Sequence, residues 1–144
     1  MWIELLTGLD LACKFTAPAA TNRIAEAEKA LKVLFPEELK SVLLESNGVL
    51  GRYDLDLLWN VDRIRQENLT FRTTTMFKDL YMPFDHLLFF ADAGNGDQFA
   101  YPVLNGKVRR DDIFVWNHED DSRSWLVPNL RTYFEWCLGT QSET

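Results

Sequence analysis

The 144-residue sequence predicts an α+β fold, in which N-terminal helices and a C-terminal helix pack on an antiparallel β-sheet. Apolar residues recur at helical spacing before residue 48 and again after Pro128. Between these segments, short apolar runs are separated by turns rich in glycine, asparagine and aspartate, which is typical of antiparallel strands. Repeats, linkers and low-complexity stretches are absent from the sequence, so we expect residues 1–144 to form one domain.

Three helices are predicted in the N-terminal third of the chain. The first carries an apolar stripe over residues 2–13 and is broken by the segment around Pro18. The second begins at Thr21 or Asn22, either of which can cap it. The third has Pro36 in its first turn and ends at Asn47-Gly48.

The central part of the chain changes to a period of two. Tyr53, Leu55, Leu57 and Trp59 alternate with mostly polar residues and predict a strand. A short helical turn over residues 61–68 is expected to follow it. Residues 70–85 show no clear period, and we predict an irregular loop there.

Two hairpins are expected after this loop. Residues 86–91 and 99–103 are apolar enough to pair across the turn at residues 92–97. Pro102 would have to occupy an edge or a bulge, because it lacks a backbone N–H. Asn105-Gly106 is a strong two-residue turn signal, and we expect residues 113–117 to form the next strand.

A closing helix is predicted from Pro128, with Leu130, Tyr133, Phe134, Cys137 and Leu138 on one face. Gly139 is expected to end it, and residues 140–144 are expected to fray. Cys13 and Cys137 both fall on apolar stripes, which favours free buried thiols over a disulfide.

Charge and composition exclude several classes of function. Asp and Glu total 22 against 15 Lys and Arg, for a formal net charge of −7. This balance argues against direct nucleic-acid binding and against binding to an anionic membrane surface. No apolar stretch approaches the ~20 residues of a membrane span, so we expect a cytoplasmic protein.

The loop at residues 92–97 resembles part of a calcium site, because Asp92 and Asp97 flank two glycines and an asparagine. Its spacing nevertheless fails the EF-hand pattern, since Val103 stands where the bidentate glutamate is required. Gly94, Asn95 and Gly96 are better explained as a structural turn that needs positive φ angles. We therefore expect no metal and no cofactor here.

Catalytic patterns are also missing from the sequence. His118-Glu119 begins like a zinc-protease helix, but residue 122 is serine where the second histidine is needed. There is no Gly-x-Ser-x-Gly elbow, and each cysteine lies on a predicted core stripe. We assign no catalytic residue and expect a protein that is not an enzyme.

The best candidate for a partner-binding site is the segment after the predicted strand at residues 113–117. An apolar anchor with an acidic rim is typical of protein-binding patches. The predicted patch consists of Trp116, Asn117, His118, Glu119, Asp120 and Asp121, with Asp92 and Asp97 as secondary members. We expect that reversing the charges of residues 119–121 weakens binding without unfolding the chain. The alternative is that Trp116 is a core residue, as buried tryptophans commonly are, and the sequence leaves the exposure of the acids open.

Three blocks of sequence are similar to the SUKH superfamily of Smi/Knr-like domains. They are Ile24–Glu28 continuing to Asn47-Gly48, Leu87–Phe99, and Phe114–Asp120 followed by the helix at residues 128–138. The resemblance covers residues 21–139. It implies an α+β domain without settled catalytic residues, of the type that serves as bacterial immunity proteins.

The leading functional hypothesis is therefore an immunity protein that binds and neutralises a cognate polymorphic toxin, such as a nuclease. An acidic inhibitor would be steered toward the basic surface that a nuclease presents to phosphates. One alternative is an intracellular scaffold or regulatory module with no toxin partner. Another is a small-molecule or nucleotide-binding protein.

Overall fold

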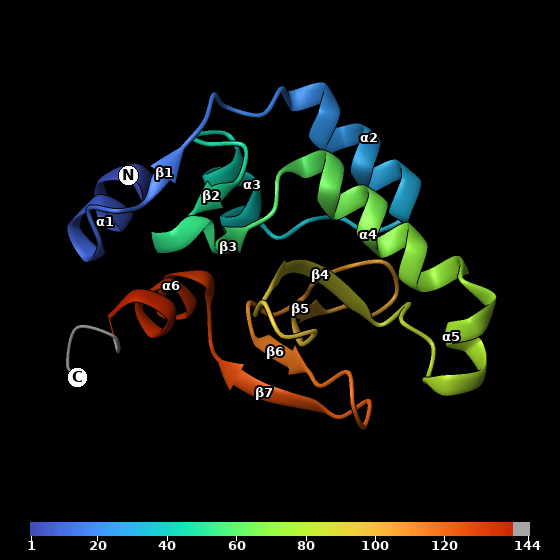
Figure 1. The fold of residues 1–144 in the computed structure, drawn as a ribbon. Coiled ribbons are helices and arrows are strands. Elements are labelled where there is room, and N and C mark those ends of the chain that lie inside the picture. Colours follow the sequence, from blue (N-terminus) through green and yellow to red (C-terminus); the bar gives the residue numbers. More distant parts are fainter. Residues whose placement is uncertain (140–144) are drawn as a thin grey trace.

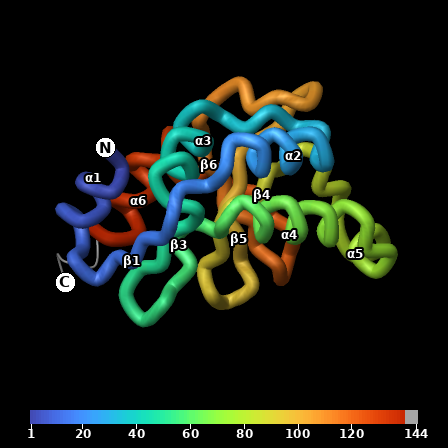
Figure 2. The backbone as a smooth tube through the Cα atoms, turned by 90° about the horizontal axis from the view of Figure 1, so that it is seen from above, coloured from blue at the N-terminus to red at the C-terminus, as the bar shows by residue number. Residues whose placement is uncertain are grey.

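The computed structural model describes residues 1–139, and within them it has the predicted α+β architecture. The tail predicted at residues 140–144 lies outside the described residues. The elements form two groups: α1, α3, α6 and the smaller sheet lie toward one end, and the larger sheet, α2, α4 and α5 lie toward the other (Figures 1 and 2). Helices α2 and α4 lie side by side, and α4 packs against the larger sheet. The helices are α1 (Trp2–Leu9), α2 (Thr21–Leu31), α3 (Glu37–Leu43), α4 (Val61–Thr73), α5 (Thr75–Leu80) and α6 (Leu130–Leu138).

The described strands form two antiparallel sheets where the sequence predicts one. The smaller sheet has the order β1-β2-β3, and the larger has the order β4-β5-β6-β7. A backbone hydrogen bond from Trp59 N to Phe90 O (2.9 Å) links the end of β3 to β4. The strands are β1 (Lys14–Phe15), β2 (Val49–Leu50), β3 (Asp56–Leu58), β4 (Leu87–Asp92), β5 (Gln98–Pro102), β6 (Ile113–Trp116) and β7 (Arg123–Val127).

The predicted starts of the second and third helices agree with the structure, but the predicted cap does not. Helix α2 begins at Thr21, yet its N-cap is Ala20 and no side chain caps it, so capping by Thr21 or Asn22 is wrong. Helix α3 begins directly after Pro36, whose fixed φ suits that position. Helix α1 is shorter than predicted: it ends at Leu9, and Asp10 is already extended with φ −156°. Its carboxylate accepts a hydrogen bond from Ala12 N (2.9 Å), which stabilises the turn that leads into β1.

The prediction of an irregular loop over residues 70–85 is wrong. Helix α4 continues to Thr73, and α5 follows it almost at once. The threonines between the two helices obscure the helical period in the sequence. In the structure, the side chains of Thr73 and Thr74 each donate a hydrogen bond to the carbonyl four residues earlier (2.7 and 2.6 Å), as threonines within a helix can. Phe77 and Tyr81 then face inward together, at the spacing of one helical turn.

Of the strand predicted over residues 53–59, only Asp56–Leu58 forms a strand, β3. Residues 52–54 form a 3-10 turn, η1 (Arg52–Asp54), in which Tyr53 and Asp54 have φ angles of 62° and 58°. Strand β7, in contrast, was not predicted, because Arg123–Val127 lacks a clear alternation. Pro102 is the last residue of β5 and pairs only with Leu87 on β4, because the pairing with β6 ends at Ala100, so it lies at a local edge as expected.

A single aromatic-rich core joins both groups of elements. The tight turn at Asn105-Gly106, with φ angles of 54° and 74°, returns the chain to Leu34 between α2 and α3. Cys13 and Cys137 are free and half-buried. The largest fully buried side chains are Trp59, Phe89, Phe90, Tyr101, Tyr133 and Phe134.

Candidate functional site

The acidic turn, residues 117–122, connects β6 to β7 and is held by its own backbone and side chains. Asn117 N donates to Ser122 O (2.9 Å), and Asp121 N donates to Asn117 O (2.8 Å). The side-chain oxygen of Asn117 accepts from Glu119 N (2.8 Å), and that of Asp120 accepts from Ser122 N (2.9 Å). These short polar side chains replace the hydrogen bonds that the turn backbone cannot make to a strand, which explains the composition of the segment.

Asp121 faces inward, unlike its neighbours in the turn. One oxygen accepts from Trp116 Nε1 (2.7 Å) and pairs with Arg123 (2.9 Å), and the other accepts from Met82 N (2.8 Å). Burial alone would raise the pKa of this carboxyl, but these donors outweigh it and the pKa of Asp121 is lowered. Arg123 also donates to the carbonyls of Met82 and Pro83, so this ion pair ties the acidic turn to the segment after α5.

The prediction that Trp116 is an exposed anchor is wrong. Its side chain is only 3% exposed, and its indole N–H is satisfied by Asp121. The ring lies edge-on within a cluster of aromatic side chains, formed by Phe71, Tyr81, Phe84 and Phe89. A residue on the inner face of a central strand packs in the core, so the alternative interpretation of Trp116 holds.

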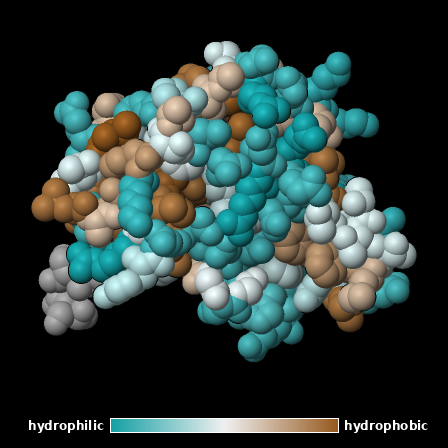
Figure 3. Space-filling model, turned by 45° about the horizontal axis from the view of Figure 1, so that its top comes forward, coloured by the Kyte–Doolittle hydropathy of each residue, from teal (hydrophilic) through white to brown (hydrophobic). Residues whose placement is uncertain are grey.

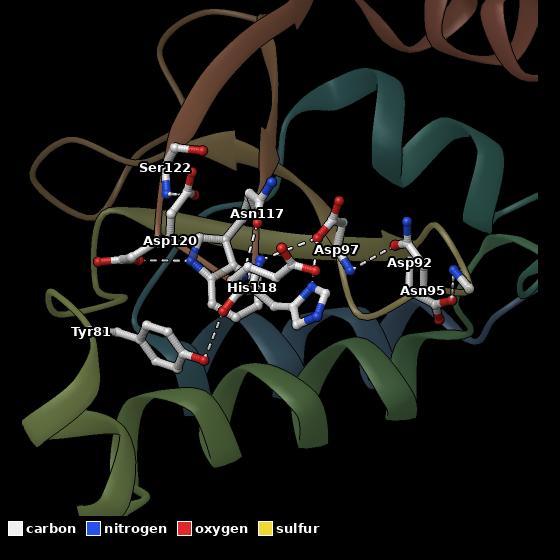
Figure 4. A network of polar contacts seen from close by, with 12 residues as sticks. Tyr81, Asp92, Asn95, Asp97, Asn117, His118, Asp120 and Ser122 are labelled. Carbon is white, nitrogen blue, oxygen red and sulfur yellow. Dashed lines mark hydrogen bonds and ion pairs between the residues drawn. The ribbon is translucent and has the colours of Figure 1, made fainter.

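His118 connects the acidic turn to the loop between β4 and β5 (Figure 4). Asp97 accepts from the backbone N of His118 (3.1 Å) and lies 2.7 Å from its Nδ1. On the other side, Tyr81 Oη donates to His118 O (3.0 Å). A Cβ on Gly96, which has φ 104°, would lie 2.8 Å from His118 Nδ1, so this close approach requires glycine. The two hairpin turns and the end of α5 therefore form one connected unit.

Asp92 belongs to a different set of contacts. Its Oδ2 accepts from Trp59 Nε1 (2.9 Å) and from Arg63 (3.1 Å), and its Oδ1 accepts from Gly94 N (3.0 Å). It therefore fixes β4 against β3 and α4 rather than contributing to the acidic turn.

The loop that follows Asp92 is a compact turn. Gly94 has φ 87°, and Asn95 Oδ1 accepts a hydrogen bond from Asp97 N (3.0 Å). Asp97 and Asp121 are both partly covered and engaged by cationic or imidazole partners. Of the predicted acidic residues, the structure leaves Glu119 and Asp120 exposed.

An exposed apolar surface adjoins these two acids. Met82, whose backbone N–H is bound by Asp121, is 65% exposed, and Met76 and Leu80 on α5 are 67% and 63% exposed. Apolar side chains gather over α5 in the space-filling view (Figure 3). A hollow of about 450 Å³ lies there; its lining is partly apolar (Phe71, Phe77, Tyr81, Met82, Pro83 and Phe84) and partly charged (Arg72, Lys78 and Asp85). We call Glu119, Asp120, Met76, Leu80 and Met82 the α5–turn surface.

The apolar half of this surface does not appear among the residues predicted from sequence, because α5 lies within the predicted loop at residues 70–85. The available signal is the spacing of four residues within two apolar pairs, Phe77 with Tyr81 and Met76 with Leu80. The apolar residues beside the acidic rim thus come from α5 and Met82, not from Trp116.

The described part of the chain has neither an activated thiol at Cys137 nor a metal-binding cluster. Burial raises the pKa of the Cys137 thiol to about 12, so it is not a thiolate at neutral pH. Within residues 1–139, no group of three or more His, Cys, Asp or Glu side chains could hold a metal ion. None of the helices described there is both long and apolar enough to span a bilayer.

The sequence matches a known protein family over most of its length. No curated protein matches the chain. A family model described as SMI1-KNR4 cell-wall (SUKH_6) matches residues 21–134, which include α2 through most of α6 and the whole α5–turn surface. Because this match covers most of the sequence, the chain belongs to the SUKH family of SMI1-KNR4 proteins.

Proposed function

We propose that this chain is a non-enzymatic, cytoplasmic immunity protein that binds a polymorphic toxin and blocks its active site or substrate groove. Membership of the SUKH family is consistent with such a role. The observation that carries the proposal is the α5–turn surface, where exposed carboxylates adjoin exposed apolar side chains on a braced scaffold. The partner it fits is a protein with a basic face and an apolar protrusion.

Electrostatics supports a nuclease toxin as the partner class. A nuclease presents cations to phosphates, and an inhibitor with a net charge of −7 is attracted to the same cations. Glu119 and Asp120 would meet those cations, while Met82 and α5 would bury apolar area beside them.

The bracing of the turn favours binding by a preformed surface. Tyr81, Asp97 and Asp121 hold both hairpin turns in place through the hydrogen bonds described above. Little conformational entropy is then lost when the surface meets its partner.

The first experiment identifies and reconstitutes the complex. The full chain is used to capture partners, a captured toxin domain is purified, and its activity is measured with increasing amounts of the chain. Inhibition that is complete at one chain per toxin supports the proposal. Full toxin activity in the presence of excess chain would refute it.

The surface is then tested with matched charge variants. Glu119→Lys should slow association about tenfold at low salt and reduce its salt dependence. Glu26→Lys, an equally exposed change of the same charge on α2, is the control and should have little effect. Equal binding by both variants would show that the partner docks elsewhere. The triple reversal that includes Asp121 is unsuitable, since that residue stabilises the fold.

A regulatory or scaffold role is the second candidate, and the cell-wall description of the matched family favours it. In that case the captured partner is an endogenous protein without toxin activity. Growth of cells that carry the captured gene, with and without the chain, distinguishes the two: only a toxin kills cells that lack its immunity protein.

A further inference from the structure

A second exposed apolar surface lies at the opposite end of the molecule from α5, where α1, α6 and the β1-β2-β3 sheet meet (Figure 1). Four large side chains are exposed there: Leu11 (87%), Tyr53 (94%), Leu55 (37%) and Trp136 (43%). They border three neighbouring hollows: the one beside η1 shares Arg52 and Leu138 with one of the others, and Leu55 and Leu57 with the remaining one. We call these four side chains the Tyr53 face, and apolar colours appear at this end in Figure 3 as well.

Tyr53 is held in solvent by a strained backbone. It and Asp54 have φ angles of 62° and 58°, a region that costs a non-glycine residue free energy. The turn is closed by a hydrogen bond from Gly51 N to Leu55 O (2.7 Å). Ion pairs brace it on both sides: Lys14 with Asp54 (2.6 Å), and Arg52 with Asp10 (3.1 Å). The turn thus holds the Tyr53 ring in solvent on a backbone with positive φ angles.

A hollow suited to such a ring lies directly beside it. It has a volume of about 240 Å³, and Leu55, Leu57 and Leu138 line it together with the η1 turn. A second hollow of about 200 Å³ continues from Leu55 toward Trp136. A protruding ring next to an apolar recess on the same surface is self-complementary, which is what a two-fold interface requires.

Charge on this face also matches a second copy better than a basic partner. The exposed cations Lys14 and Arg52 stand beside the exposed anion Asp54, and each is already paired within the chain. The two ion pairs cancel within each chain, so this face can meet a second copy across a two-fold axis without like-charge repulsion. The α5–turn surface, which presents Glu119 and Asp120, would instead repel a second copy of itself.

We propose that the Tyr53 face is a homodimer interface, in which Tyr53 of each copy enters the recess formed by Leu55, Leu57 and Leu138 of the other. The pairing leaves the α5–turn surface open at the two far ends of the dimer. It does not depend on the identity of the toxin or on the proposed immunity role.

The test measures molecular mass against concentration by sedimentation and light scattering on the full chain. The wild type should change reversibly from one chain to two as concentration rises. Tyr53→Gly should raise the dimer dissociation constant at least about tenfold, because it removes the central ring. Trp125→Ala is the control: this tryptophan is 55% exposed on β7, and its loss should leave the dimer unchanged.

Tyr53→Gly also separates loss of the dimer from loss of the fold. Glycine accepts a positive φ without strain, so the melting temperature of the monomeric variant should not fall. Tyr53→Phe, which keeps the ring, should dimerise like the wild type. A wild type that stays monomeric at every concentration overturns the proposal, even if Tyr53→Gly weakens binding to another protein. A dimer that survives Tyr53→Gly overturns it as well.

Discussion

Asn68 on α4 and Phe89 on β4 form a reciprocal pair of hydrogen bonds. The side-chain amide of Asn68 donates to Phe89 O (2.8 Å) and accepts from Phe89 N (2.9 Å). A buried asparagine thereby occupies the place of a further strand beside β4 and satisfies two backbone groups at the sheet edge. It also attaches α4, and through it the α5–turn surface, to the larger sheet.

Replacing Asn68 with Leu should lower the free energy of unfolding by about 2–4 kcal/mol, because both backbone groups of Phe89 lose their partner in the core. Asn68→Asp should also destabilise, since a carboxylate cannot donate to Phe89 O. Urea denaturation measures both effects. Gln66→Ala, on the exposed side of the same helix, is the control and should change stability by less than about 0.5 kcal/mol. Equal stability of Asn68→Leu and wild type would contradict this role.

Glu38 should make stability depend on pH in an unusual direction. Burial raises the pKa of its carboxyl, while Tyr101 Oη (2.7 Å) and Leu130 N (2.9 Å) donate to it and oppose the rise. A carboxyl with a raised pKa is deprotonated more easily in the unfolded chain, so its contribution to stability declines as pH rises from about 4.5 through the folded-state pKa.

Glu38→Gln isolates this effect, because its amide oxygen can accept both hydrogen bonds and has no charge to bury. The unfolding free energy of the wild type should fall relative to that of Glu38→Gln as pH rises above 4.5. Above that window, the variant should be at least as stable as the wild type. Denaturation curves at a series of pH values test this, and a difference that is constant with pH would refute it.

Loss of charge should reduce the stability of the fold at Asp121 but not at Glu119, two residues away in the same turn. Asp121→Asn removes the charge that faces Arg123 and should cost about 1–3 kcal/mol, whereas Glu119→Gln should be neutral. Because the pKa of Asp121 is lowered, its contribution is present at neutral pH and is lost as pH falls below about 3.8. The stability gap between Asp121→Asn and wild type should therefore close in acid. A gap that persists unchanged there would contradict the assignment.

Gly96 and Gly94 provide a matched comparison in the loop between β4 and β5. Both have positive φ angles, so alanine is strained at either position. Only Gly96→Ala places a methyl group within 2.8 Å of His118, since the nearest atom to a Cβ at Gly94 is 3.8 Å away. Gly96→Ala should therefore destabilise the chain by about 1–2 kcal/mol more than Gly94→Ala. It should also break the His118–Asp97 contact, which amide NMR of His118 would report.

The elements predicted correctly are those whose signals are local. Pro36 and Asn47-Gly48 mark the limits of the region containing α3, and the apolar run after His86 marks β4. Strand β7 and helix α5 are not evident from the sequence, because contacts with distant segments decide which of their residues are buried. Tyr81 is covered by Trp116, and Arg123 is bound by Met82 and Pro83.

The candidate site shows the same division. The sequence alone predicted the α+β class, the antiparallel hairpins, the family resemblance and the acidic composition of residues 118–121. Only the tertiary structure decided which acids face solvent: Asp121 turns inward to Trp116, Met82 and Arg123, whereas Glu119 and Asp120 remain outside. Local propensities are set by each residue and its near neighbours, but burial depends on partners that are far apart in the chain and meet only when it folds.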